Sequence, residues 1–250
     1  MSADREGDVT GAFVSLSRSL VDGLDAVDLL GEVTETCARL LDIASAGLLL
    51  ADTRGVLHVL AASSERTRNL ELFQLQREQG PCLDCYRSGV PVSVPDLALE
   101  ADRWPLFARA ASEAGFASVH AVPMRLRENR LGALGLFGSA VGSLQPEDLR
   151  LAQALADVAS VALVADKIAA DRLVITEQLQ TALNGRVALE QAKGLLAQLG
   201  DLEMEESFVA LRHYARDHNE RLSDTALAVV SRQLPAQRVL DHARTRAVGG

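Results

Sequence analysis

LQTALNGRVALEQAKGLLAQLGDLEMEESFVALRHYARDHNERLSDTALAVVSRQL, residues 179–234, is the stretch that says most about this chain. Apolar residues recur at intervals of three and four between Leu179 and Leu199, a spacing that predicts an amphipathic helix. Gly200 follows the last periodic residue, where glycine accepts the left-handed conformation of a helix cap without strain. We therefore expect one long helix that stops at Gly200-Asp201.

Two shorter helices are predicted after this stop. The second helix starts near residues 202–204, ends around 218–219, and brings four apolar side chains onto one face: Met204, Phe208, Leu211 and Ala215. The third covers about 223–233, with Ser223 as its N-cap and Pro235 just beyond it. Because none of the three helices buries its apolar stripe alone, we expect them to pack as a small bundle. Residues 235–250 are expected to form a flexible tail.

This stretch resembles the ANTAR module, a three-helix RNA-binding domain at the output end of bacterial transcription antitermination regulators. The residues that carry the resemblance are Arg186, the run LEQAKG at 189–194, Phe208, Leu211-Arg212, Ala215 and Asn219. The resemblance implies an ANTAR domain over residues 172–234. Proteins of this family are thought to hold two adjacent hairpins with looped bases as a dimer, so tandem RNA hairpins in nascent transcripts are the implied partner.

The apolar pattern leaves a set of polar residues on the outside of the predicted bundle. Any one of them could belong to a solvated face, but as a group in an RNA-binding family they are typical of a surface that contacts phosphates and bases. The implied RNA-binding residues are Arg186, Gln191, Lys193, Gly194, Arg212, Asn219 and Arg221.

Charge argues against unspecific nucleic-acid binding. The chain has a formal net charge of -9; residues 1–165 hold 14 Lys+Arg and 22 Asp+Glu, and residues 166–250 hold 11 and 12. The second part is therefore nearly neutral (11 - 12 = -1), and affinity that depends on phosphate neutralisation should be low. Recognition of RNA would then depend on a few placed residues and on unpaired loop bases.

Composition sets the remaining limits. A length of 250 residues suggests one or two domains, and no apolar run is long enough to span a membrane. The N-terminus MSADREGDVTG is acidic and polar without a hydrophobic signal core, so we expect a cytoplasmic protein. Three cysteines, an odd number, do not indicate a disulfide framework.

The first 165 residues mix helical and strand patterns. Helices are predicted at 10–20, 27–41, 64–79 and 104–114; strands are predicted at 46–51, 56–61, 90–94, 118–126 and 131–137. The first two strands are joined by the turn-rich segment 52–55, which is typical of a hairpin. The order predicts an α+β domain with a mostly antiparallel sheet flanked by helices.

This part also resembles a GAF domain over roughly residues 10–165, the small-molecule sensory fold common in bacterial regulators. Three segments carry the resemblance: 79–98 (QGPCLDCYRSGVPVSVPDLA), 103–126 and 131–138 (LGALGLFG). Together they are similar to actinobacterial proteins that join a GAF to an ANTAR domain. Since GAF domains bind many ligands or none known, the cofactor stays unknown and a small-molecule effector is only implied.

Cys82 and Cys85 form the one chemically suggestive pair in the first domain. A lone C-x-x-C is either a redox dithiol or half of a zinc site, and no second pair completes zinc coordination, so we predict no metal. We expect both cysteines to line the sensory pocket, with Tyr86, Trp104 and His120 as further candidates. Some GAF domains reduce methionine sulfoxide with cysteines in a related region, which leaves a thiol enzyme as an alternative, although no motif predicts a catalytic residue.

The connection between the domains has its own pattern. From Pro146 to Ala182 apolar residues recur in steps of three, four and seven, interrupted at Arg172, which predicts a coiled-coil-like helix over 146–182. An exposed seam of this kind tends to pair with a second chain, so we expect a parallel homodimer. Asn184-Gly185 weakens the helix locally. The pair is either a hinge or a surface variation without a functional role.

The sequence thus predicts a non-enzymatic, signal-responsive antitermination regulator, in which a GAF domain controls RNA binding by an ANTAR domain. A DNA-binding regulator is the weaker alternative, because the third helix (residues 223–233) carries one arginine and few base-reading side chains. A third possibility is a protein-interaction module whose acidic first half contacts a protein partner.

Overall fold

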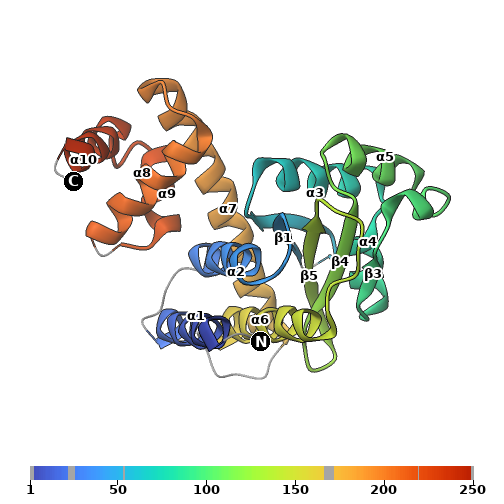
Figure 1. The fold of residues 1–250 in the computed structure, drawn as a ribbon. Helices are drawn as coiled ribbons and strands as arrows, with labels where there is room; N and C mark the ends of the chain where they lie inside the picture. The colour runs from blue at the N-terminus through green and yellow to red at the C-terminus, as the bar shows by residue number, and fades with distance from the viewer. Residues whose placement is uncertain (1–2, 22–25, 53, 166–171, 219, 249–250) are drawn as a thin grey trace. The chain divides into compact units, whose positions relative to one another are not determined.

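The computed structural model describes residues 3–21, 26–52, 54–165, 172–218 and 220–248 (Figure 1). The chain divides into two compact units, Met1–Gln180 and Thr181–Gly250. Within the described ranges, no helix has the length and apolar character required to cross a membrane.

The first unit is built on a five-stranded antiparallel sheet of order β2-β1-β5-β4-β3. Its strands are β1 (Ser45–Ala51), β2 (Leu57–Ala62), β3 (Val92–Val94), β4 (Ser118–Leu126) and β5 (Asn129–Gly138). The predicted hairpin at 52–55 is confirmed: Asp52 accepts hydrogen bonds from the backbone N–H groups of Arg54 and Val56 at 2.8 and 2.9 Å. All five predicted strands are present, with ends shifted by up to two residues.

Helices cover both faces of this sheet, and they divide into two groups of three. One face packs against α2 (Ala26–Leu40) and α6 (Pro146–Ala165), and α1 (Ala3–Val21) packs on these two helices. The other packs against α3 (Glu65–Arg77), α4 (Pro81–Ser88) and α5 (Pro105–Glu113), with a 3₁₀ helix η1 at Leu97–Glu100. Two covered faces explain why every residue of β1 is buried. The α+β architecture predicted from the sequence is confirmed.

A pair of glycines marks one place on the α3–α4 face of the sheet. Gly47 of β1 lies opposite Gly135 of β5 in the strand register. A Cβ added to Gly47 would stand 2.9 Å from Glu71 Oε1, and one added to Gly135 would stand 2.7 Å from Cys82 Sγ. Both distances are shorter than a normal carbon contact, so the two glycines leave room for side chains of α3 and α4.

The second unit is helical. Its elements are α7 (Arg172–Gly200), which begins before the unit boundary, α8 (Met204–Asp217), α9 (Leu222–Val230) and α10 (Ala236–Val248). Small and branched apolar side chains fill its interior, among them Leu189, Ala192, Leu196, Leu211, Ala226, Val229, Val239 and Leu240. The helices predicted to end at Gly200, to span about 204–218 and to begin near 223 are therefore present.

Three details differ from the sequence-based expectation. Asp201, with φ of 52°, takes the left-handed position after α7, while Gly200 is the last helical residue. Gly200 serves packing instead, because a Cβ there would stand 2.6 Å from Leu240 Cδ2. Arg221, not Ser223, occupies the N-cap of α9, so this helix starts one residue before the predicted N-cap.

The expected flexible tail is also wrong. Residues 236–248 form α10, which packs against α8 and buries Val239 and Leu240. Its apolar residues recur at helical spacing, and Pro235 precedes its first residue, a position that a helix tolerates. The bundle therefore has a fourth helix that the pattern analysis did not predict.

The predicted seam through 146–182 is described only in part. In α6, Leu155 is fully buried, and α6 packs against β4 and α2 of its own unit. Val161 remains 48% exposed. The seam side chains from Ala162 to Ala182 lie outside the described residues, so the pairing of two chains along this helix stays a prediction.

Candidate nucleic-acid interface and the core around Cys82

Two cations of α7 share one carboxylate. The Arg186 guanidinium lies 2.8 Å from Glu190 Oε1, one helical turn away, and Lys193 Nζ lies 3.5 Å from the same oxygen. The Arg186 and Glu190 side chains are 14% and 22% exposed. Two positive groups thus lie against one carboxylate oxygen.

The sequence pattern predicted that Lys193 lies on the outside of the bundle, and this prediction is wrong. Its side chain is only 6% exposed, and its ammonium lies 5.9 Å from the centre of the Phe208 ring on α8. The long aliphatic stem of lysine packs against apolar neighbours while the charged end finds a carboxylate and a ring face. This placement depends on how α7 and α8 pack, which a single-helix pattern does not contain.

The remaining predicted residues are spread over the unit. Gln191 and Gly194 are exposed on α7, Arg212 is half-buried on α8, and Arg221 is exposed at the start of α9. Asn219 lies outside the described residues. The structure thus brings Arg186 and Lys193 together through Glu190, a residue that the sequence analysis did not single out as a site residue.

Gly194 is an exposed glycine within helix α7. A Cβ added there would meet nothing within 4 Å, so packing of this unit does not require a glycine. Glycine within a helix costs about 1 kcal/mol relative to alanine. Gly7, Gly11 and Gly31 are helical glycines with equally open surroundings, so openness alone does not mark a site; at Gly194 it leaves room for another backbone to approach closely.

A ring cluster at the end of α8 was missed by the sequence analysis. The Tyr214 and His218 rings are stacked, with centroids 3.9 Å apart and planes inclined by 12°. His242 of α10 stands edge-on to both, 5.4 Å from each centroid, and its Nε2 lies 2.9 Å from Asp217 Oδ2. The i, i+4 spacing of Tyr214 and His218 could have indicated that their rings meet on one face of a helix. His242 gave no such signal, because it lies in the segment predicted to be a flexible tail.

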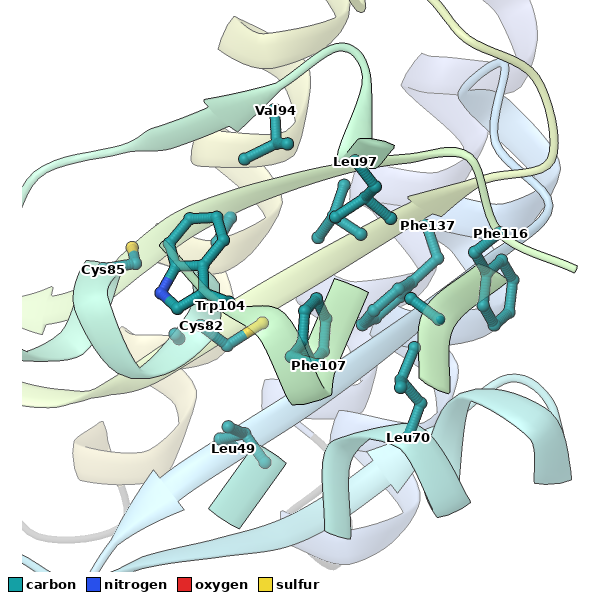
Figure 2. Close-up of a cluster of buried hydrophobic side chains, with 14 of the residues drawn as sticks. Leu49, Leu70, Cys82, Cys85, Val94, Leu97, Trp104, Phe107, Phe116 and Phe137 are labelled. Atoms are coloured by element: carbon teal, nitrogen blue, oxygen red, sulfur yellow. The ribbon is translucent and has the colours of Figure 1, made fainter. Parts of the chain in front are cut away.

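In the first unit, three of the predicted pocket residues lie in a packed core. Cys82 and Cys85 of α4 are fully buried, and Trp104 at the start of α5 is 3% exposed. Figure 2 shows Trp104 beside the helix that carries both cysteines, with Phe107 next along α5. Tyr86 is half-buried and packs against the same cluster. The prediction that these residues gather in one place is consistent with this arrangement, although here they fill a core.

Glu71 of α3 adds a carboxyl group to this core, and it is fully buried. Cys82 Sγ donates a hydrogen bond to Glu71 Oε1 at 3.4 Å, and the Gln74 amide donates to Glu71 Oε2. Within the described part of the chain, Gln74 Oε1 is buried and has no hydrogen-bond partner. The sequence held a signal for this cluster, since Glu71 falls on the inward face of its predicted helix and two glycines interrupt the strands that it faces.

Burial controls the protonation of these groups. Loss of water on burial raises the pKa of Glu71 to about 8 despite the hydrogen bonds from Cys82 and Gln74, so the carboxyl is largely neutral near pH 7. Burial also raises the pKa of Cys85 to about 12 and that of Cys82 well above its ordinary value, to which the neighbouring Glu71 carboxyl contributes. Thiols with raised pKa values are poor nucleophiles at neutral pH.

His120 does not join the cysteines. In β4 its neighbours Val119 and Ala121 face the core with Cys82, so the alternation of the strand directs His120 to the opposite face. Its Nδ1 lies 2.6 Å from Ser93 Oγ, and it lines a cavity of about 240 Å³ with residues such as Ser118 and Asp148. Burial lowers the pKa of His120. The expected common pocket for His120 and the cysteine pair is therefore wrong.

The described residues contain no group of three or more His, Cys, Asp or Glu side chains placed to hold a metal ion. The three cysteines are all free and buried. Cys82 and Cys85 pack in the buried cluster of the first unit, and burial keeps both thiols protonated.

Solved structures share the fold of the first unit. The GAF domain of an Acinetobacter phosphoenolpyruvate-protein phosphotransferase matches with a TM-score of 0.52 at 13% identity, covering 65% of this chain and 93% of that one. A GAF domain region of a Geobacter sulfurreducens membrane protein has a TM-score of 0.47 at 18% identity over 58% and 97%. Free methionine-R-sulfoxide reductase of Neisseria meningitidis has 0.47 at 14% over 73% and 95%, too low a score to bear on activity.

Family models divide the chain where the structure divides it. No curated protein matches the sequence. The model of the GAF domain matches residues 23–164, more than half of the chain, and the model of the ANTAR domain matches residues 177–230. The second match includes the basic cluster and Gly194 of α7. It also includes the stacked rings of Tyr214 and His218, but not His242. The chain therefore belongs to the GAF domain family and joins that domain to an ANTAR domain, the architecture of a GAF–ANTAR antitermination regulator.

Proposed function

We propose that this chain, as a homodimer, holds tandem RNA hairpins in nascent transcripts and prevents terminator formation, under control of an unidentified small-molecule effector of the GAF domain. An ANTAR domain implies RNA binding and antitermination. The effector acts only through different affinities for two states of the GAF domain. The finer assignments rest on the residues of α7 and α8.

The observation that carries the proposal is the charge cluster Arg186–Glu190–Lys193. Glu190 lies between the two cations, 2.8 Å from Arg186 and 3.5 Å from Lys193. It holds the guanidinium in place before any ligand arrives, which reduces the conformational entropy lost on binding. Arginine in such a position contacts phosphate oxygens in a planar, bidentate manner. We assign the phosphate contact to Arg186 and a supporting role to the buried Lys193.

Gly194 lies one residue beyond Lys193 on the same helix and supports a contact surface there. Because its position is exposed and open, an RNA backbone can approach the helix more closely than any side chain would allow. Gln191, also exposed, provides an amide that both donates and accepts hydrogen bonds to bases. The modest charge of the domain agrees with recognition of a few phosphates and of unpaired bases.

The test compares two arginine variants. Arg186→Gln removes a cation from an i,i+4 pair with Glu190; Arg109→Gln does the same to the exposed i,i+4 pair with Glu113 in the GAF domain. Crosslinking to cellular RNA followed by sequencing should show loss of hairpin RNA for Arg186→Gln alone. Loss of one phosphate contact should also lower the slope of log affinity against log salt by roughly 0.7 to 1. Equal retention by both variants would contradict the assigned surface.

The dimer is tested separately along the predicted seam. Ile175 belongs to the heptad-like repeat, and aspartate there would place a charge in the interface between two chains. We expect Ile175→Asp to lower the mass measured by light scattering from that of two chains to that of one. Affinity for tandem hairpins should fall further than affinity for a single hairpin, because avidity is lost.

The structure favours RNA over DNA for a specific reason. The short helix α9, LSDTALAVV, would have to act as the recognition helix of a DNA-binding motif, and it has no arginine, lysine, asparagine or glutamine. A thiol enzyme is disfavoured by the burial of Cys82 and Cys85. In a titration with a thiol-specific reagent, we expect the native chain to react slowly and all three cysteines to react rapidly in denaturant.

A further inference from the structure

We propose that His218, stacked on Tyr214, is a platform on which an unpaired base of the bound RNA stacks. This inference rests on the proposed RNA-binding function and names a part of the surface that basic residues alone do not provide. Unpaired bases in RNA loops are commonly held on aromatic rings, histidine included.

The buried Tyr214 side chain fixes the position of the His218 ring on the second unit. Tyr214 is 7% exposed and belongs to the interior of the bundle, and the His218 ring lies 3.9 Å from it, almost parallel. His218 itself is exposed. Because Tyr214 covers one face of the His218 imidazole, the solvent-accessible area of the ring lies on its other face and its edge. A base can stack on that other face without rearrangement of the protein.

Hydrogen bonding also orients the ring. His218 Nδ1 lies 2.8 Å from the backbone oxygen of Tyr214, and because a carbonyl only accepts, Nδ1 carries the proton. In the neutral imidazole, Nε2 is then the acceptor. It can receive a hydrogen bond from an exocyclic amine of a base, which adds some base preference to a stacking surface that every base could use.

Helix α10 is held on α8 by contacts other than the stacked rings of Tyr214 and His218. The bond between His242 Nε2 and Asp217 Oδ2 at 2.9 Å joins α10 to α8, and buried Val239 and Leu240 supply the apolar contact. His242 meets the stack with its edge, 5.4 Å from the His218 centroid, and does not lie over it as a second layer. An exposed imidazole held parallel to a buried tyrosine is thus left with a surface that packing does not use.

The place of His218 in the chain suits RNA contact. Arg221, an exposed member of the predicted RNA-binding set at the N-cap of α9, lies three positions further along the chain, so the two Cα atoms are at most roughly 11 Å apart. A base on His218 and a phosphate near Arg221 can therefore belong to adjacent nucleotides.

The experiment uses the full-length protein and hairpin RNAs that it selects from a pool with randomised loops. A selected hairpin is then labelled with 2-aminopurine at each loop position in turn, since the fluorescence of this base changes when it stacks. We expect one position to respond strongly with the native protein and to lose that response with His218→Ala. Affinity should fall by roughly tenfold in the same variant, within the range for loss of one base–aromatic stack.

Two variants separate stacking from structure. His218→Phe keeps a flat ring and should retain the response at that position. Asp217→Asn weakens the bond to His242 beside the stack and should leave both affinity and response nearly unchanged. An abasic nucleotide at the responding position should weaken the native protein as much as His218→Ala does, and the two losses should not add.

Each contrary result has a distinct meaning. If the native protein selects hairpins but His218→Ala binds them equally well, the platform is wrong and the RNA-binding function stands. An equal loss of affinity in Asp217→Asn would show that the effect comes from α10 and not from a stacked base, which also overturns the proposal. If the native protein selects no hairpin, the proposed function fails together with this inference.

Discussion

The Cys82 thiol donates a hydrogen bond to the Glu71 carboxyl at 3.4 Å, in a fully buried place where α4 meets α3. The strands beneath them carry Gly47 and Gly135, opposite each other in the register. A neutral carboxyl group is thus enclosed in the α3–α4 face of the GAF sheet. Two predictions depend on this cluster.

The first prediction concerns pH. Burial raises the pKa of Glu71 from 4.5 to about 8, so between these values the folded chain binds more protons than the unfolded chain. The free energy of unfolding contributed by this group is therefore complete below pH 4.5 and is lost as pH rises through 8, by at most about 1.4 kcal/mol per pH unit. Glu71→Gln should flatten this dependence in urea titrations, whereas exposed Glu128→Gln should leave it in place. An unchanged pH profile in Glu71→Gln would contradict the buried acid.

The second prediction concerns the space between the strands and α4. In Gly135→Ala, the new methyl group would stand 2.7 Å from Cys82 Sγ and 2.8 Å from Glu71 Oε1, so these buried side chains must move within a filled core. We expect the free energy of unfolding to fall by about 1–3 kcal/mol, the usual cost of overpacking. Gly31→Ala on α2, where a Cβ meets nothing within 4 Å, is the matched control and should not destabilise the domain. Equal stability of the two variants would show that the core has spare volume.

The third prediction separates stability from RNA binding at Gly194. Gly194→Ala should stabilise the ANTAR domain by about 0.5–1 kcal/mol, because alanine favours the helix and has open space there. If an RNA backbone approaches this position, the same change should weaken hairpin binding. Thermal unfolding and a binding titration would thus move in opposite directions. A stabilised variant that binds hairpins as well as the native chain would exclude close backbone approach, and Gly31→Ala should leave binding unaffected.

The fourth prediction concerns α10. Leu240 is 2% exposed, and it occupies the space that Gly200 leaves open at the end of α7. Leu240→Ala should cost about 2–5 kcal/mol in the unfolding of the second unit, because it removes a buried side chain and leaves a cavity. Leu227→Ala, a change of the same size at a side chain that is 56% exposed on α9, should stay within about 0.5 kcal/mol. If both variants unfold alike, α10 contributes nothing to the bundle.

Local patterns predicted the elements well where neighbours along the chain decide them. The hairpin around Asp52 follows from turn chemistry and from a short apolar run on either side, and β4 begins and ends where its pattern does. The helix that ends at Gly200 was found from its apolar period. The capping residues were less certain, because several residues can end a helix, and Asp201 took the position expected of Gly200.

Site residues were harder to place because their surroundings come from distant segments. Lys193 was expected outside, yet packing of α7 on α8 covers it with Phe208. His120 was grouped with Cys82, yet the alternation of β4 places them on opposite faces of the sheet. Glu190 and Glu71 were not singled out, since an acidic residue on a helix is ordinary until its partners are known.

The amino-acid sequence by itself determined which segments become helices and strands and the low charge of the second domain, because these depend on short-range periodicity and composition. The division into a GAF and an ANTAR domain was indicated by the resemblance of their motifs to those two families. Only tertiary structure decided that burial raises the pKa of Glu71 beside Cys82, that Lys193 lies against Phe208, and that α10 docks beside Tyr214 and His218. Burial and electrostatic environment are properties of segments brought together by folding, and no local pattern encodes them.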